Sequence, residues 1–187
     1  MKDFVSAFNH LANLSQDAAE DLYNCLSAKV FDKGDLLLKA GETCKKIYFV
    51  DEGLTKIFFN KGDKEFIMRF FPERTLFSVL NSFETQTPSQ FEIMALEKTS
   101  VIYLLKTDLE TLCKKHHSIE TAYRKLLSIA TINMMKRISE MLEENATERY
   151  DHFLQDNGQL LQRISLGDLA NYLGITQVSL SRIRANK

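Results

Sequence analysis

The chain contains 187 residues, of which 44% are hydrophobic and 26% charged, and its formal net charge is −1. It has neither the global basic signature of many nucleic-acid binders nor a run of roughly 20 apolar residues that could span a membrane. Cys25, Cys44 and Cys113 lie too far apart to predict a disulfide framework, a zinc site or an iron–sulfur site. Asp3 and Asn9 interrupt what would be a signal-peptide core, so we expect a cytoplasmic protein with one good core and a smaller second module.

The first segment, residues 4–28, is predicted to form one or two helices, because Phe4, Phe8 and Leu11 recur at helical spacing. From about residue 30 the apolar residues recur at every second position instead, which is typical of strands. Six or more short apolar runs follow, separated by turn signals that contain Gly34, Gly41, Gly53 and Gly62. We therefore predict an antiparallel β-roll over residues 30–106, covered by the N-terminal helices.

Residues 72–88, with the sequence PERTLFSVLNSFETQTP, interrupt this strand pattern. Their apolar residues have the spacing of a short amphipathic helix and are Leu76, Phe77, Leu80 and Phe83. A polar loop follows them. We therefore expect a short helix inside the roll.

A long helix is predicted between the roll and the C-terminal segment. Thr107 is expected to cap a short helix, and Ser118 to open a long one that runs to about Glu144. Within the long helix, a seam of about three heptads predicts a dimer interface formed by Leu127, Thr131, Met134, Ile138 and Met141. A single buried helix in a monomer is the alternative reading of the same stripe.

The C-terminal segment predicts a helix-turn-helix. Asn145 and Glu148 form a capping pair that ends the long helix and begins a new one, which makes this break a candidate hinge. Ser165 then caps one helix, Gly174 ends it, and Thr176 caps a second helix that begins at Gln177. We therefore divide the chain into residues 1–144, with a dimerisation helix over about 118–144, and a module of residues 145–187.

The second helix of this motif carries side chains that suit DNA. Arginine can bind guanine and glutamine adenine with two hydrogen bonds each, and valine can contact the methyl group of thymine. The candidate DNA-binding residues are Thr176, Gln177, Val178, Ser181, Arg182 and Arg184. From Arg163 onward, Arg163, Arg182, Arg184 and Lys187 outweigh Asp168, giving +4 − 1 = +3. A helical hairpin that merely packs is the alternative.

The order of the predicted elements along the chain resembles that of the Crp/Fnr family of transcription regulators. The resemblance rests on the stretch KGDLLLKAGETCKKIYFVDEGLTKIFF, the hairpin turn at Lys61-Gly62-Asp63, the short helix in the roll, and the long helix before a helix-turn-helix. It implies an α+β fold with an N-terminal antiparallel β-roll of the jelly-roll type, flanking helices, a dimerisation helix and a small helical DNA-binding module.

The resemblance also implies a function. Such a protein is not an enzyme: it binds a palindromic site on double-stranded DNA as a homodimer, with RNA polymerase and a small-molecule effector as further partners. The alternative is a ligand-sensing roll protein whose degenerate C-terminus does not bind DNA specifically, because little sequence follows the second helix for the β-hairpin wing that many relatives carry. A roll-type metalloenzyme is excluded, since all four histidines fall in predicted helices. We predict no catalytic residue, no metal and no cofactor.

The residues at the positions where the family binds its ligand differ from the family pattern. Relatives hold a ribose with a glycine–glutamate pair on the short helix and a cyclic phosphate with an arginine next to serine or threonine. Here proline precedes Glu73, and the stretch Thr87-Pro88-Ser89-Gln90 has no arginine. We therefore expect that cyclic AMP does not bind in the usual way and leave the effector unnamed. The candidate ligand-binding residues are Glu73, Arg74, Ser89 and Thr131.

Overall fold

The computed structural model describes residues 1–186, so Lys187, which we counted in the C-terminal module, lies outside the described residues. Two N-terminal helices, α1 (Lys2–Leu11) and α2 (Gln16–Asn24), confirm the helical start of the chain. The helical segment ends before residue 28, because the first strand, β1, already covers Ser27–Phe31 and pairs with the last strand of the roll.

Eight strands form two four-stranded sheets, and every pair of neighbouring strands is antiparallel. One sheet has the order β1-β8-β3-β6 and the other β2-β7-β4-β5. The bounds of the remaining strands are β2 (Leu36–Leu38), β3 (Lys46–Glu52), β4 (Thr55–Lys61), β5 (Lys64–Phe71), β6 (Leu76–Phe77), β7 (Glu92–Ala95) and β8 (Thr99–Leu105). The predicted antiparallel roll is confirmed.

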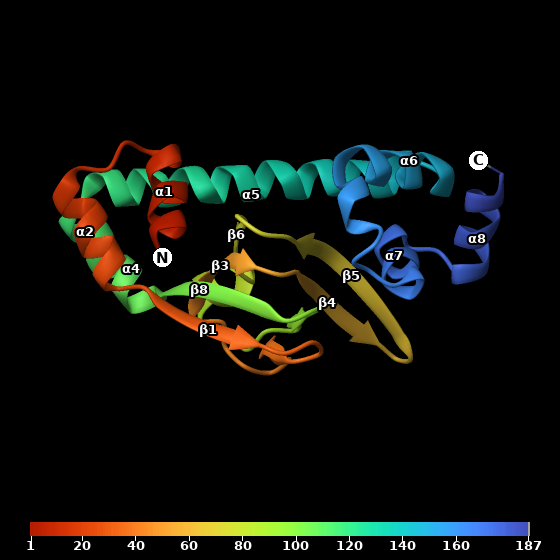
Figure 1. The fold of residues 1–187 in the computed structure, drawn as a ribbon, viewed down its shortest axis with the longest axis horizontal. Helices are drawn as coiled ribbons and strands as arrows, with labels where there is room; N and C mark the ends of the chain where they lie inside the picture. The colour runs from red at the N-terminus through yellow and green to blue at the C-terminus, as the bar shows by residue number, and fades with distance from the viewer. Residues whose placement is uncertain (187) are drawn as a thin grey trace.

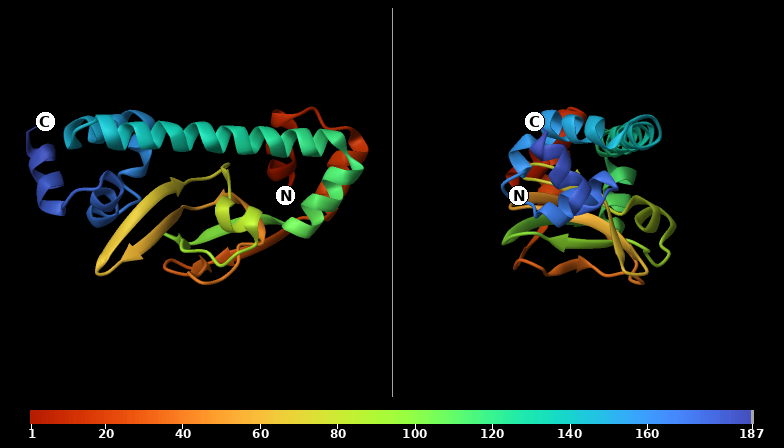
Figure 2. Two further views of the ribbon diagram at one scale, coloured as in Figure 1. Left: turned by 180° about the vertical axis from the view of Figure 1, so that it is seen from behind. Right: turned by 90° about the vertical axis from the view of Figure 1, so that its right-hand side faces the viewer.

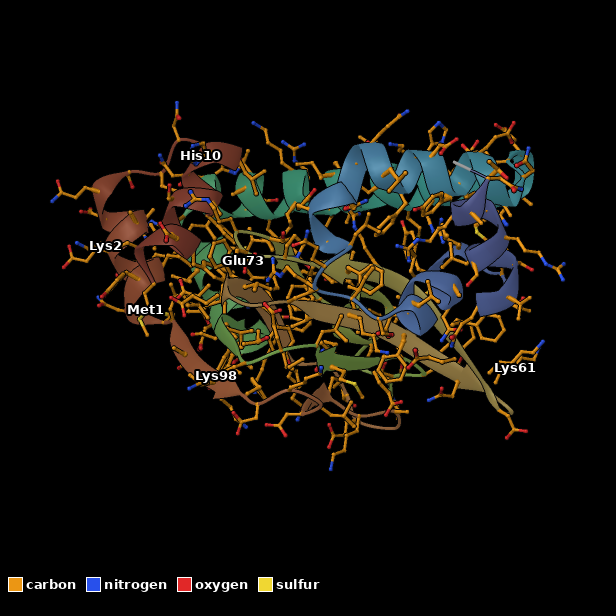
Figure 3. The ribbon with its side chains drawn as sticks, turned by 45° about the vertical axis from the view of Figure 1, so that its right-hand side comes forward. Met1, Lys2, His10, Lys61, Glu73 and Lys98 are labelled. Carbon is orange, nitrogen blue, oxygen red and sulfur yellow. The ribbon has the colours of Figure 1, made fainter. Side chains whose placement is uncertain are left out.

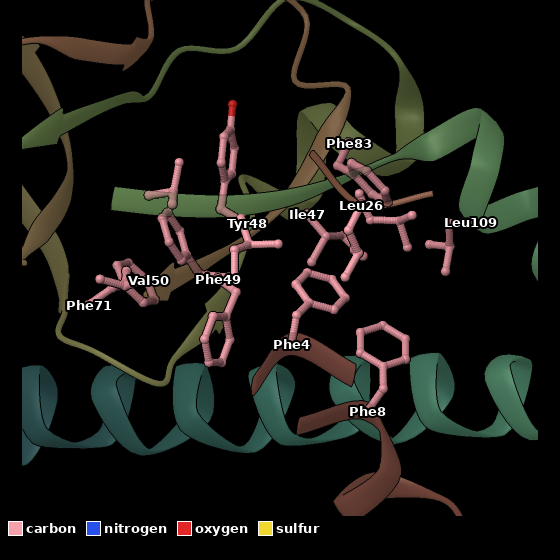
Figure 4. Close-up of a cluster of buried hydrophobic side chains, with 14 of the residues drawn as sticks. Phe4, Phe8, Leu26, Ile47, Tyr48, Phe49, Val50, Phe71, Phe83 and Leu109 are labelled. Atoms are coloured by element: carbon pink, nitrogen blue, oxygen red, sulfur yellow. The ribbon is translucent and has the colours of Figure 1, made fainter. Parts of the chain in front are cut away.

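The core of the roll extends to the helices that cover it. Phe4 and Phe8 of α1 are fully buried, with their rings stacked 5.2 Å apart. They point toward the roll, where Phe49 lies with its ring centroid 6.0 Å from that of Phe4 (Figure 4). Burial of these aromatic side chains stabilises the contact by roughly 1.5–3 kcal/mol for each one fully removed from water. The N-terminal helix is therefore part of the core.

The insertion in the roll is shorter than predicted. Helix α3 covers only Leu80–Thr85, because Leu76 and Phe77 form β6 and pair with Phe49 and Tyr48 of β3. Phe83 of α3 is fully buried in the core of the roll.

A long helix, α5 (His117–Glu143), runs over the roll from one end of the molecule to the other (Figure 1). A shorter helix, α4 (Lys106–Lys115), precedes it. The predicted caps at Thr107 and Ser118 are wrong: the helices begin at Lys106 and His117, and neither start has a side-chain cap. Instead, the Lys106 N–H donates to the Lys45 carbonyl at 2.9 Å, so pairing with the roll fixes where α4 begins.

The C-terminal module contains α6 (Ala146–Asn157), a 3-10 turn η1 (Gly158–Leu160), α7 (Leu166–Leu173) and α8 (Gln177–Ala185). Its local signals are confirmed. Asn145 and Glu148 form a full capping box, and the side chains of Ser165 and Thr176 accept from Asp168 N–H at 2.9 Å and Ser179 N–H at 3.1 Å. Gly174 ends α7 with φ of 71°, a conformation that is cheap only for glycine.

Within residues 1–186, no helix is both long and apolar enough to cross a membrane. The same residues contain no cluster of three or more histidine, cysteine, aspartate or glutamate side chains that could hold a metal ion.

Candidate nucleic-acid interface and ligand cavity

Helices α7 and α8 pack on each other through their apolar faces, as the spacing predicted. The residues of these faces that are buried are Leu169, Ala170, Leu173 and Leu180, with Ile175 and Ile183 packed against them. The outer face of α8 is open, and α8 lies at the end of the molecule (Figure 2). All six candidate DNA-binding side chains are exposed there: Thr176, Gln177, Val178, Ser181, Arg182 and Arg184.

The other side of the module docks against the β4–β5 hairpin of the roll. Phe70 of β5 packs its ring 5.4 Å from Tyr172 of α7 and 6.3 Å from Phe153 of α6, measured between centroids. Leu54, Phe58, Ile67 and Phe70 thus share one apolar cluster with helices α6 to α8. We call this contact the junction.

Lys56 of β4 is buried in the junction, with its side chain 6% exposed. Its Nζ donates to both carboxylate oxygens of Glu65 at 2.8 Å and to Oδ1 of Asp168, in the first turn of α7, at 2.7 Å. Burial raises the pKa of Asp168, but hydrogen bonds from Lys56 and Ser165 outweigh it, so the pKa lies below its usual value. Asp168 therefore ties the helix-turn-helix to the roll as a carboxylate.

A second ionic contact joins the two parts through Arg163, which precedes α7. Its Nη1 and Nη2 donate to Glu73 at 2.9 and 2.7 Å, and its Nη2 also donates to Oε1 of Glu97 at 2.5 Å. Glu73 also accepts from the Gly53 N–H at 3.0 Å. The hydrogen bonds from Arg163 lower the pKa of Glu73 and outweigh its partial burial.

This contact gives Arg163 and Glu73 different surroundings from those we expected. Arg163 faces the roll rather than DNA, so it adds no free charge to the outer face of α8. Glu73 (Figure 3) lies in the turn between β5 and β6, well before α3, and its carboxylate is already occupied. The residues that lead into α3 are Ser78 and Val79, which supply no carboxylate for a sugar.

A cavity of about 620 Å³ lies between α1, the roll and α5. Of the four candidate ligand-binding residues, only Arg74 lines it. Ser89 is buried and bonded to its own loop, since its Oγ donates to the Phe91 carbonyl at 2.8 Å and accepts from the Phe91 N–H at 2.9 Å. Thr131 is exposed on α5 and donates to the Leu127 carbonyl at 2.9 Å.

The face of α5 that points away from the roll is apolar and open. Among the candidate dimer residues, Leu127 is half-buried and Thr131, Ile138 and Met141 are exposed, whereas Met134, although exposed, lines the cavity between α5 and the roll. Three further side chains that we did not assign are more exposed than any of these apolar ones: Ile132 at 67%, Met135 at 61% and Leu142 at 81%. Because α5 is apolar on several faces, a heptad pattern read from the sequence could not tell which of its apolar residues face the roll and which face away from it.

Comparisons with known proteins agree with this architecture. Residues 28–116 match the family model described as the cyclic nucleotide-binding domain. FixK2 from Bradyrhizobium japonicum superposes with a TM-score of 0.75 at 18% identity, over 86% of this chain and 83% of that one. No curated protein matches the chain in sequence.

Two further solved structures are similar over most of their length. CLP from Xanthomonas campestris, described as a regulator responsive to c-di-GMP, has a TM-score of 0.74 at 14% identity, over 92% of this chain and 91% of that one. A regulator of the Crp/Fnr family from Eubacterium rectale has a TM-score of 0.72 at 14% identity, over 91% of this chain and 82% of that one. The fold that the resemblance to Crp/Fnr regulators implied is therefore confirmed.

Proposed function

We propose that the chain is a cytoplasmic, homodimeric transcription regulator of the Crp/Fnr type that binds a palindromic DNA site and has no catalytic role. The observation that carries this proposal is the outer face of α8, on which all six candidate DNA-binding side chains are exposed while the inner face is buried. In a helix-turn-helix, the second helix enters the major groove with this kind of face.

The side chains of α8 have separate roles in this proposal. Arg182 and Gln177 offer bidentate hydrogen bonds to base edges, and Val178, which is 61% exposed, offers apolar contact to a thymine methyl. Thr176 and Arg184 lie at the two ends of the helix, where they can bind phosphate and fix its register on the duplex.

The open apolar face of α5 supports the homodimer. A face that carries Ile132, Met135, Ile138 and Leu142 is costly to leave in water, and a second copy of the same face would cover it. Two-fold symmetry would then present two copies of α8 to two half-sites of a palindrome. RNA polymerase and an effector in the cavity are further partners that the resemblance implies.

The DNA site is unknown, so the test begins by selecting bound fragments from random duplex DNA. We expect enrichment of a palindrome, and we expect Arg182→Ala to weaken binding to it by roughly 1–3 kcal/mol, or about 5- to 150-fold, and to relax specificity at one base. The control is Lys33→Ala, which removes one positive charge from an exposed turn of the roll and should leave binding unchanged.

Selection that yields no shared sequence, together with binding that depends only on salt, would contradict this proposal. It would favour the alternative, a roll that senses a ligand without reading DNA specifically. Sedimentation of the purified protein tests the homodimer separately, and Leu142→Glu is expected to shift it toward the monomer.

A further inference from the structure

The cavity beneath α5 is lined mainly by apolar side chains. Its walls include Phe49 and Phe71 from the strands, Phe77 from β6, and Leu126 and Ala130 from α5. Its volume of about 620 Å³ is within the range of roughly 300–1,000 Å³ that holds a small organic ligand. Such walls suit an apolar body and offer little to the sugar and purine of a nucleotide.

The charged groups that line the cavity are unbalanced. Arg69, Arg74 and Arg137 face only one carboxylate among the lining residues, that of Asp3. Among residues 1–186, Arg69 has no ion pair, and its guanidinium lies 5.9 Å from the centre of the Phe71 ring. Arg137 has one carboxylate partner, Glu140, at 3.4 Å. The cavity walls therefore carry more positive than negative side chains, and two of the three arginines, Arg69 and Arg74, are exposed.

Two of these arginines lie near the same residue, Tyr172 of the module. Arg137 places its guanidinium 4.0 Å from the centre of the Tyr172 ring and donates to the Tyr172 carbonyl. Burial raises the pKa of the Tyr172 phenol, the positive charges of Arg137 and Arg69 oppose that rise, and the carboxylates of Glu140 and Asp156 add to it. Arg69 and Arg137 therefore both lie toward the end of the cavity that borders the module, where Asn133 of α5 also lines it.

A β-bulge aims Arg69 into the cavity. Ile57 of β4 pairs with Arg69 and the next residue, Phe58, pairs with Ile67, which leaves Met68 as an extra residue in β5. In a bulge, two consecutive side chains point to the same face of the sheet. Met68 and Arg69 accordingly both line the cavity, whereas Ile67 and Phe70 on either side of them pack into the junction.

We propose that this cavity binds an organic anion with an apolar body, whose acidic group is held by Arg69 and Arg137. The walls take the body, and the guanidiniums, which match planar carboxylates and phosphates, take the charge. The ligand would compete with the Tyr172 carbonyl for Arg137, so it would act on the contact between α5 and α7. This inference goes beyond DNA binding, and its test uses no DNA, so either proposal can fail alone.

The test is titration calorimetry of the full chain with three probes that share one alkyl chain: decanoate, decyl phosphate and decanol, each below its micelle concentration. We expect at least one of the two anions to bind roughly tenfold tighter than decanol, because a charge-assisted hydrogen bond contributes more than a neutral one. A preference between decanoate and decyl phosphate then identifies the acidic group.

Variants locate the binding. Arg69→Gln should weaken the anions about tenfold and leave decanol unchanged, whereas Arg69→Lys, which keeps the charge but not the planar fork of donors, should weaken them less. Arg124→Gln, on the exposed surface of α5, should change nothing. Ala130→Phe should weaken all three probes, because the new ring would occupy the cavity.

Three results would overturn the proposal. One is decanol binding as tightly as both anions to the wild-type protein, a result that needs no variant. A second is that neither anion binds. The third is an equal loss of anion affinity in Arg69→Gln and Arg124→Gln, because that result would place the anion on the open face of α5.

Discussion

The two apolar clusters of the molecule are built differently. The core of the roll, between the two sheets, α1 and α5, buries Phe4, Phe8 and Phe49, and none of the described residues buried in it is charged. The junction also packs aromatic rings, but it encloses the charged side chain of Lys56, and Arg163 forms an ion pair with Glu73 at its edge. Apolar packing places no charge, whereas a buried ion pair is favourable only while its charges stay in contact and hydrogen-bonded. Apolar packing thus holds the roll together, whereas the ion pairs of the junction hold the C-terminal module in one defined position.

The largest expected effect comes from the roll core. Phe49→Ala should lower the free energy of unfolding of the whole protein by about 3–5 kcal/mol, because it removes a fully buried ring and leaves a cavity. Urea unfolding followed by circular dichroism measures this. Phe66→Ala, at a ring that is 36% exposed, is the matched control and should cost clearly less. Equal losses in both variants would remove the distinction between core and surface of the roll.

In the junction, a single change should release the module without unfolding the roll. Lys56→Met leaves Glu65 and Asp168 together without their cation, and breaking a buried ion pair in this way costs about 3–5 kcal/mol. Amide hydrogen exchange of α7 should accelerate while that of β3 and β8 stays slow. Lys61→Met, at the exposed tip of the same hairpin (Figure 3), is the control. If exchange rises equally throughout the roll, the two clusters form one cooperative unit.

Acid should act on the junction before it acts on the apolar core. The pKa values of Glu73 and Asp168 are lower in the folded protein than their usual values of 4.5 and 3.8. The stability that these carboxylates contribute is therefore present above about pH 4 and is lost as the pH falls through the lower, folded values. Exchange of α7, corrected for its intrinsic pH dependence, should rise below about pH 4, and less so in Lys56→Met, where the contact with Asp168 is already broken.

The smallest expected effect is at the break between α5 and α6. Asn145→Ala removes the side chain that accepts from Thr147 N–H and Glu148 N–H, at 2.9 and 3.2 Å. Loss of such a cap costs about 1 kcal/mol. Thermal unfolding monitored by circular dichroism should show a small shift, with faster exchange confined to the first turn of α6. Thr147→Ala, at the second residue of the same helix, should shift it less.

Sequence reasoning was reliable where the signal was local. The caps at Asn145, Ser165 and Thr176 and the glycine at 174 each depend on residues within a few positions, and all form as predicted. The strands of the roll were also predicted correctly, because the alternation of apolar residues is a pattern that extends over only a few residues. The caps at Thr107 and Ser118 failed because contacts with the roll and the preceding helix, rather than a local side chain, set these helix starts.

The candidate site was only half visible in the sequence. The exposed face of α8 follows from helical spacing, but Arg163 and Glu73 are 90 positions apart and no periodicity links them. Arg69, which lines the cavity without an ion pair among residues 1–186, gave no signal because a bulge rather than regular alternation decides which way it points. The partner of Arg163 and the direction of Arg69 are therefore set by packing between segments that are distant in the sequence, and local sequence patterns do not reveal them.

The bulge at Met68 also bears on how this strand can change length during evolution. A deletion in a strand normally turns every following side chain to the opposite face of the sheet. Loss of Met68 would instead restore regular pairing, since Ile67 and Phe70 would still face the junction and Arg69 the cavity. Relatives that are one residue shorter here can therefore keep both contacts, whereas a deletion of Phe66 would turn Arg69 toward the junction and Phe70 toward the cavity.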